Sequence, residues 1–130
     1  MLVVKTILKE SPGKGIGLFA AEQLSKGQIW SEEHPDFDIH LARSLVDQMK
    51  NNVYRDFIHI YGEYNETSEL FKISIDNGRF INHSDTPNTM YIRQHGYSIT
   101  TKDIDAGEEL TIDYNTICDD FKKKGFYTGD

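Results

Sequence analysis

Two segments of this chain restrict its possible folds the most: Arg79-Phe80-Ile81-Asn82-His83-Ser84 and, further along, Glu109-Leu110-Thr111-Ile112-Asp113-Tyr114. In the first, three polar residues follow two apolar ones, which favours irregular backbone because such side chains bond to nearby main-chain groups. The second is a strand-like stretch that ends in an acid and a phenol. Together they can supply backbone polar groups for a polar cofactor and a tyrosine hydroxyl for transfer chemistry.

Each segment also has a plainer interpretation. Residues 82–84 can form a polar loop that satisfies its own groups. By strand alternation Tyr114 shares a face with Leu110 and Ile112, and a tyrosine on an apolar face usually belongs to the core with its hydroxyl hydrogen-bonded. Taken singly, neither segment identifies a function.

A third segment, Gly13-Lys14-Gly15-Ile16-Gly17, is a glycine-rich loop near the N-terminus. Residues 15–20 satisfy the dinucleotide-binding pattern G-x-G-x-x-G/A and follow a predicted strand. A Rossmann unit needs a helix next, whereas Ser25-Lys26-Gly27 interrupts the chain too soon, so we reject that fold. The loop is then either a plain turn or a place where the backbone approaches a ligand and offers its N–H groups.

The composition is that of a soluble globular domain. The chain has a mass of 15.0 kDa, with 38% hydrophobic and 27% charged residues, and no apolar run long enough to cross a bilayer. We expect one domain over residues 1–130 and, with no secretory signal visible, an intracellular location, cytoplasmic if the protein is bacterial. One cysteine, Cys118, excludes an internal disulfide and a zinc site built on several thiolates.

The net charge of −7 argues against general nucleic-acid binding, which needs basic residues to neutralise phosphates. An acidic surface is compatible with a cationic ligand or a basic peptide, although solubility is the simpler explanation of the charge. The histidine spacing fits no metal-binding motif, so no metal site is expected.

The periodicity predicts a mostly β domain with many short strands and one clear helix. Leu41, Leu45 and Met49 recur at four-residue spacing, which indicates a helix over residues 41–52. Residues 62–68 are predicted to form a polar loop. Strands are expected at residues 2–8, 17–21, 28–33, 70–75, 89–93, 97–102 and 109–114.

In this order and spacing, the Gly-x-Gly loop, the Asn-His-Ser triplet and the Glu-Leu-Thr-x-Asp-Tyr segment resemble the SET-domain lysine methyltransferases. The resemblance covers residues 3–115 and points to a minimal, free-standing member of bacterial or viral type. It implies a mainly β fold of several small curved sheets with one or two short helices. A C-terminal segment would be threaded under a preceding loop as a pseudoknot, and residues 116–130 would form a tail.

The resemblance also implies a methyl donor, S-adenosylmethionine, and a lysine acceptor in a protein substrate. Tyr114 would be the catalytic tyrosine at the mouth of a narrow channel whose walls include Ile112, Phe121 and Phe126. The donor and the substrate lysine would enter from opposite faces. By similarity, the contacts of the donor fall on the backbone of Lys14, Gly15, Ile16 and Gly17 and on Arg79, Asn82 and His83.

The chain departs from the family pattern in three respects. With one cysteine it cannot build the zinc cluster that follows the core in many relatives, and Phe121, Phe126 and Tyr127 would close the channel and cover the adenine instead. Ile112 stands where relatives often place Phe or Tyr, a position that tunes how many methyl groups are added. The insert over residues 34–69 lies in the region that usually determines the substrate of a SET domain. It resembles no insert whose substrate preference is known.

Partners and alternatives stay open at this point. The acidic residues Glu32, Glu33, Asp36 and Asp38 either favour a basic substrate protein, bound as an added strand at a sheet edge, or form a solvated surface. A lone small SET domain can complete its channel by pairing with a second copy; no membrane partner is expected. Two rival functions are a SET-fold module that binds cofactor or peptide without turnover, and a methyltransferase acting on a small amine. Retention of Tyr114 argues against the binding module.

Overall fold

The computed structural model describes residues 1–121, so the expected roles of Phe126 and Tyr127 lie outside the described residues. The strands are β1 (Thr6–Ser11), β2 (Gly15–Ala20), β3 (Ile29–Glu32), β4 (Ile39–Ala42), β5 (Glu63–Asn65), β6 (Leu70–Ile73), β7 (Asn82–His83), β8 (Thr89–Ile92), β9 (Tyr97–Thr100) and β10 (Thr111–Ile112). The helices are α1 (Arg43–Asp47) and α2 (Asn52–Tyr61), together with the 3₁₀ helices η1 (Asn77–Phe80) and η2 (Tyr114–Thr116).

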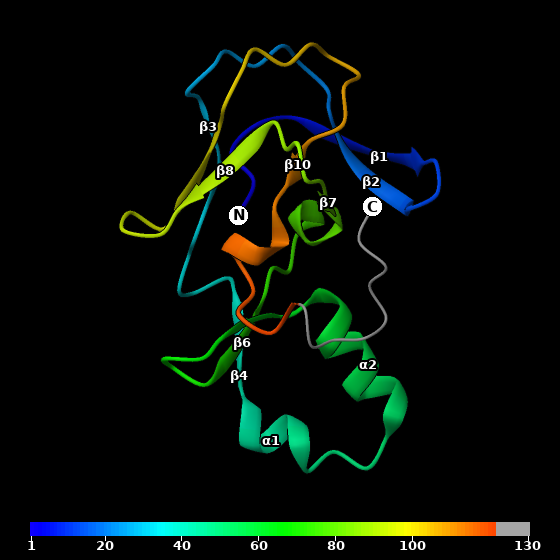
Figure 1. The fold of residues 1–130 in the computed structure, drawn as a ribbon, viewed down its shortest axis with the longest axis vertical. Helices are drawn as coiled ribbons and strands as arrows, with labels where there is room; N and C mark the ends of the chain where they lie inside the picture. Colours follow the sequence, from blue (N-terminus) through cyan, green and yellow to red (C-terminus); the bar gives the residue numbers. More distant parts are fainter. Residues whose placement is uncertain (122–130) are drawn as a thin grey trace.

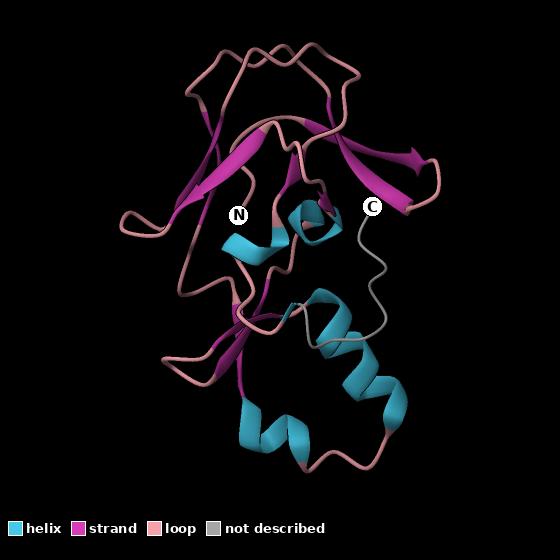
Figure 2. Ribbon diagram, viewed as in Figure 1, coloured by secondary structure: helices cyan, strands magenta, loops and turns pink. Residues whose placement is uncertain are grey.

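Within this described range the strands form four small sheets (Figure 2). β1 and β2 pair as an antiparallel hairpin, β3, β9 and β8 form a three-stranded sheet, and β4, β6 and β5 form another. The fourth sheet is the parallel pair of β7 and β10, whose register joins Asn82 to Thr111 and His83 to Ile112. The expected mainly β fold of several small sheets with short helices is confirmed.

The parallel pair lies in the middle of the molecule (Figure 1). The β1–β2 hairpin, β3 and β8 lie toward one end of the long axis, while β4, β6 and both helices lie toward the other. Each strand of the pair is only two residues long. Main-chain pairing alone therefore cannot hold β10 in place, and side chains must contribute.

Asn88 supplies that contribution. Its Nδ2 donates to the carbonyl of Glu109 (2.8 Å), and its Oδ1 accepts from the N–H of Thr111 (2.8 Å). The hydroxyl of Thr89 donates to the Thr111 carbonyl (2.7 Å). Because Asn88 is 8% exposed and Thr89 is fully buried, water cannot readily replace these bonds. Asn88 was not singled out from the sequence.

Two groups of buried side chains form the core. One, around β2 and β10, consists of Leu18, Ala20, Leu24, Trp30, Ile81, Ile104, Leu110 and Ile112. The other, around α2 and β6, consists of Val46, Ile58, Tyr64, Phe71, Ile73 and Cys118. Ile117 packs against both groups, so the segment that follows β10 joins the two halves of the molecule.

The prediction of one helix over residues 41–52 is wrong. Leu41 belongs to β4, where pairing with β6 outweighs the helical spacing of its side chain, and α1 begins after it. A second helix, α2, follows and is capped by the Asn51 side chain, which accepts two backbone N–H groups (2.9 and 3.2 Å). α2 contains β-branched and aromatic residues of modest helix propensity, and Ile58 alone among its residues is fully buried. Within residues 1–121, no helix is long and apolar enough to span a bilayer.

Three other segments differ from expectation. The loop predicted over residues 62–68 contains β5. The strand predicted over residues 2–8 begins later and runs to Ser11, because it pairs with β2 along its whole length. The strand predicted over residues 109–114 is reduced to β10, since the chain turns into η2 at Tyr114.

The Asn88 bonds make a prediction about stability. Asn88→Ala leaves the Glu109 carbonyl and the Thr111 N–H without these partners in buried surroundings. Because each of the two unsatisfied buried groups costs about 1–3 kcal/mol, the free energy of unfolding should fall by about 2–6 kcal/mol. Urea unfolding followed by circular dichroism measures it. Asn77→Ala, at an exposed position in η1, is the matched control, and an equal loss in the two variants would contradict the role of Asn88.

Candidate functional site

The β1–β2 hairpin turns through the glycine-rich loop. Gly13 and Gly15 have φ angles of +77° and +78°, left-handed conformations that favour glycine. The N–H of Lys14 donates to the carbonyl of Ser11 (2.9 Å), which closes the turn. The Lys14 ammonium donates to the carbonyl of His83 (2.6 Å). The loop is thereby fastened to β7.

Gly17 lies against the carboxylate of Glu109. A Cβ at Gly17 would be 2.5 Å from Glu109 Oε2 and 3.0 Å from Ser11 Cβ. The carboxylate has little freedom to move, because Oε1 accepts from the Ser11 hydroxyl (2.7 Å) and Oε2 accepts from Asn82 Nδ2 (2.8 Å). The Gly17 backbone can therefore lie this close to the Glu109 carboxylate only because residue 17 has no side chain. Glu109 was not singled out from the sequence as a structural residue. It could have been noticed because it is an acid placed directly before the apolar, alternating part of the last predicted strand.

Asn82 joins the glycine loop to β7. Its side chain is buried, and Nδ2 donates to the carbonyl of Ile16 (3.2 Å) as well as to Glu109. Because these partners are distant in the sequence, the interpretation of residues 82–84 as a self-contained polar loop is wrong. The glycine loop is thus brought together with Asn82 and His83, and the contact of these residues with a methyl donor stays a prediction.

The ring of His83 joins β7 to the start of η2. Its Nδ1 accepts from the N–H of Tyr114 (3.1 Å), and its Nε2 lies 3.0 Å from Asp85 Oδ1. An Nδ1 that accepts a hydrogen bond carries no proton, so the network assigns the hydrogen to Nε2, which donates to Asp85. The buried His83 ring therefore holds the backbone of Tyr114 at a set distance from β7.

Tyr114 lies where the sequence placed it, against the core group that contains Leu110 and Ile112. Its hydroxyl donates to the carbonyl of Ile81. The Phe121 ring packs against it at 5.4 Å between centroids, and Phe121 also lies 5.1 Å from the ring of His83. Phe121, expected at the channel, thus contacts Tyr114, whereas Phe126 lies outside the described residues.

Tyr114 and Ile112 face two adjoining pockets. Tyr114 lines one of about 40 Å³, together with Arg79 and Ile81. Ile112 lines another of about 40 Å³, which also has Ile81 and Ile117 in its wall. The two predicted channel residues therefore lie in neighbouring pockets, which share Ile81 and Ile117 together with Glu63, Ser74 and Gly78.

Arg79 reaches the Tyr114 pocket from η1. Its Nη1 donates to the carbonyls of Ile75 (3.3 Å) and Asp76 (2.9 Å), and its guanidinium lies 4.5 Å from the ring centroid of Phe80. These contacts orient a permanent positive charge beside Tyr114.

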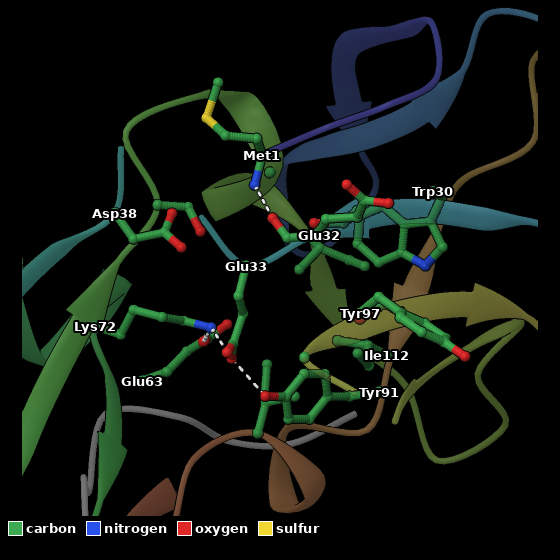
Figure 3. Close-up of a pocket in the computed structure, with 17 residues that line it drawn as sticks. Met1, Trp30, Glu32, Glu33, Asp38, Glu63, Lys72, Tyr91, Tyr97 and Ile112 are labelled. Atoms are coloured by element: carbon green, nitrogen blue, oxygen red, sulfur yellow. Dashed lines mark hydrogen bonds and ion pairs between the residues drawn. The ribbon is translucent and has the colours of Figure 1, made fainter. Parts of the chain in front are cut away.

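The pocket lined by Ile112 has an ionic wall (Figure 3). Lys72 Nζ lies 2.8 Å from Glu33 Oε1 and 3.0 Å from Glu63 Oε2, and the Tyr91 hydroxyl also donates to Glu33. Burial alone would lower the pKa of Lys72, but the two glutamates raise that pKa well above its usual value. Burial and the hydrogen bond with Glu33 raise the pKa of Tyr91 to about 12, so its hydroxyl stays protonated at neutral pH.

This ionic group was not predicted. Glu33 was expected only as one of several acidic surface residues, and Lys72, Glu63 and Tyr91 were not singled out. Their positions on separate strands give no pattern in the sequence. Within residues 1–121, no three or more His, Cys, Asp and Glu side chains are arranged to hold a metal ion.

The family model of the SET domain matches residues 15–115, a span that includes most of the glycine loop, β7 and Tyr114. The chain belongs to the SET-domain family. No curated protein matches it.

Solved structures share the fold. The Chaetomium thermophilum Polycomb Repressive Complex 2, in an autoinhibited conformation bound to S-adenosylmethionine, matches 93% of this chain with a TM-score of 0.66 and 23% identity. The Neurospora SET-domain protein DIM-5, a histone lysine methyltransferase, matches 87% with a TM-score of 0.63 and 18% identity. This chain spans 16% of the Chaetomium chain and 53% of DIM-5. At such identities the similarity establishes the fold.

The ionic wall makes a prediction about pH. Partial burial alone would raise the pKa of the Glu33 carboxyl, but hydrogen bonds from Lys72 and Tyr91 and the Lys72 charge outweigh it and lower the pKa. Glu33 therefore stabilises the fold above its unfolded-state pKa, and this contribution is lost as pH falls through the lower folded-state pKa. In Lys72→Met the Glu33 carboxyl should titrate at higher pH, as followed by ¹³C NMR of the side-chain carboxyl.

Lys50→Met, which replaces an exposed lysine, is the control and should leave the Glu33 titration where it is in the wild type. A Glu33 carboxyl that titrates at the same pH in Lys72→Met and in the wild type would show that Lys72 does not set its pKa.

Proposed function

We propose that this protein is an S-adenosylmethionine-dependent protein-lysine methyltransferase. One observation carries the proposal: the glycine loop, the Asn82–His83 strand and Tyr114 are far apart in sequence and are joined by hydrogen bonds between their own atoms. Membership of the SET-domain family supports it. So does the shared fold with a complex bound to S-adenosylmethionine and with a histone lysine methyltransferase.

The residues around β7 suit the charges of this donor. Its amino-acid end carries a carboxylate and an ammonium, and the nearby ammonium of Lys14 and guanidinium of Arg79 are the cations that a carboxylate needs. A Cβ built at Gly15 would meet nothing within 4 Å, so the loop leaves space on that side. The proposed contacts fall on Lys14, Gly15, Ile16, Gly17, Arg79, Asn82 and His83.

The acceptor side suits a lysine amine. The donor supplies, when bound, a methyl group on a cationic sulfonium. A lysine must be neutral to accept it, although its pKa in water is about 10.4. Burial against Ile81 and Ile117 in the Tyr114 pocket, whose wall also carries the Arg79 guanidinium, disfavours the charged amine and so lowers its pKa, which makes a dedicated side-chain base unnecessary.

Tyr114 is proposed as the catalytic residue. Because its hydroxyl proton is donated to the Ile81 carbonyl, the hydroxyl oxygen remains an acceptor that can bind an N–H of the amine. This bond would aim the nitrogen lone pair along the line of attack, and alignment carries much of the acceleration in such displacements.

The proposed substrate is a protein that presents a lysine in an extended segment, pairing with a strand edge. The acidic side chains around the Ile112 pocket favour a basic substrate over nucleic acid. We further propose that the protein acts inside the cell.

Labelling tests the proposal. Wild-type protein is incubated with methyl-labelled S-adenosylmethionine and a cell lysate, and mass spectrometry locates the label. We expect methyl groups on lysine side chains of protein. Tyr114→Phe should lower the rate about 100-fold, since it removes a polar contact at the reacting amine. Tyr54→Phe, an exposed tyrosine on α2, is the control and should keep the wild-type rate.

Each other outcome selects a different function. Label confined to small amines would identify a small-molecule methyltransferase. Cofactor binding without any label would favour the binding module. Equal labelling by Tyr114→Phe and wild type would refute the role of Tyr114.

A further inference from the structure

One face of the molecule leaves an apolar surface uncovered. A groove of about 590 Å³ lies between α2 on one side and β4 and the end of β6 on the other. All of its lining residues are apolar or aromatic except Ser74 and Arg79. Several are far more exposed than core residues, with Val53 at 73% and Tyr54 at 62%. The groove lies toward the end of the molecule that is opposite the β1–β2 hairpin (Figure 1).

α2 forms a ridge along one edge of this groove. Val53, Phe57 and Ile60 follow one another at spacings of four and three residues, so they lie on one face of the helix. The core takes another face of α2 through Ile58, which is 5% exposed. The ring of Phe57 lies 5.0 Å from that of Tyr61 between centroids, which orients it. Contact of the ridge with a second apolar surface would remove these side chains from water.

The uncovered area is large enough for a specific interface. A fully exposed large side chain presents about 150–250 Å², so the exposed parts of Ile39, Val53, Tyr54, Phe57 and Ile75 amount to roughly 600 Å². Monomeric proteins rarely leave a larger continuous apolar patch than this in water. Covering it on two copies of the chain would bury about 1,200 Å², which is within the range of stable interfaces.

Two charges on the same surface are complementary. Arg79 lines the groove, and Asp56 lies on α2 next to Phe57 and three residues from Val53. Within residues 1–121, neither Arg79 nor Asp56 forms an ion pair. A second copy would therefore bring an acid on its ridge to a groove that holds a base. The net charge of −7 opposes association of copies elsewhere on their surfaces, whereas the lining of this groove contains no carboxylate.

We propose that this face binds a second copy of the chain in a two-fold dimer, with the α2 ridge of each copy in the groove of the other. Ridge and groove adjoin on one surface, so a single two-fold axis can bring each to its counterpart. Ser74 and Arg79 line the Tyr114 pocket as well as the groove, so the second copy lies beside that pocket.

Sedimentation velocity tests the oligomeric state of the wild type. Over about 5–200 μM protein, the species of 15.0 kDa should be replaced by one of twice that mass, with the micromolar dissociation constant expected of a small specific interface. A species of 15.0 kDa at every concentration would overturn the proposal and leave the groove to a partner of another kind.

Two variants test whether the copies meet at this face. Val53→Glu places a carboxylate on the ridge, where pairing would bury it in an apolar groove whose cation faces Asp56. The dissociation constant should rise at least about 100-fold. The variant should fold, because residue 53 lies in the first turn of α2, where acids are favourable. Ile7→Glu makes a comparable change at a half-exposed position on β1, outside the groove, and should dimerise like the wild type.

The variants also define the results that would contradict the dimer. If Val53→Glu is folded by circular dichroism and dimerises as tightly as the wild type, the copies meet elsewhere and the proposal is wrong. Equal weakening in Val53→Glu and Ile7→Glu would overturn it too, because net charge would then control the association. No step needs a methyl donor, so a monomeric wild type leaves the proposed methyl transfer standing, and a lack of methyl transfer leaves the dimer standing.

Discussion

The parallel pairing of β7 with β10 is the constraint on which the rest of the site depends. It places Asn82 and His83 beside a segment that lies far along the chain, and the ring of His83 then holds the backbone of Tyr114. Two residues of pairing are too few to be stable alone. The pair persists because buried side chains bond across it: Asn88 from the β8 side and Asn82, through Glu109, from the glycine-loop side. The glycine loop, the strand pair and Tyr114 therefore form one hydrogen-bonded unit.

This unit separates two environments of different charge. At the glycine loop, Lys14 offers a positive group, and Arg79 offers another in the wall of the Tyr114 pocket. On the side of Ile112, the pocket has more carboxylates than ammonium groups, and Asp38 Oδ1 is buried without a hydrogen-bond partner among residues 1–121. A donor with a carboxylate suits the first, and a basic peptide suits the second. The apolar residues between them, Ile81 and Ile117, would disfavour a charged amine at the point where the two ligands meet.

The features that could be predicted from the sequence are those that depend on residues adjacent in the chain. The glycine loop, the polar residues Asn82 and His83, and the position of Tyr114 on the apolar face could all be read from residue type and order. The Asn51 cap could have indicated α2. The helix was not predicted because its residues have modest helix propensity and most of its apolar side chains are exposed. Asn88, Glu109 and the Lys72 ion pairs could not be predicted as a network, because each depends on a partner that only the tertiary fold brings near. Burial, rather than residue type, distinguishes Asp38 from its acidic neighbours.

Calorimetric titration with S-adenosylmethionine tests the central claim most directly, that the unit around β7 and β10 is a binding site for this methyl donor. The account predicts saturable binding to the wild type. It also predicts binding at least about tenfold weaker to Asn82→Ala that remains folded by circular dichroism, since the glycine loop then loses one of its two links to β7. The absence of binding to the wild type at millimolar donor would contradict the account.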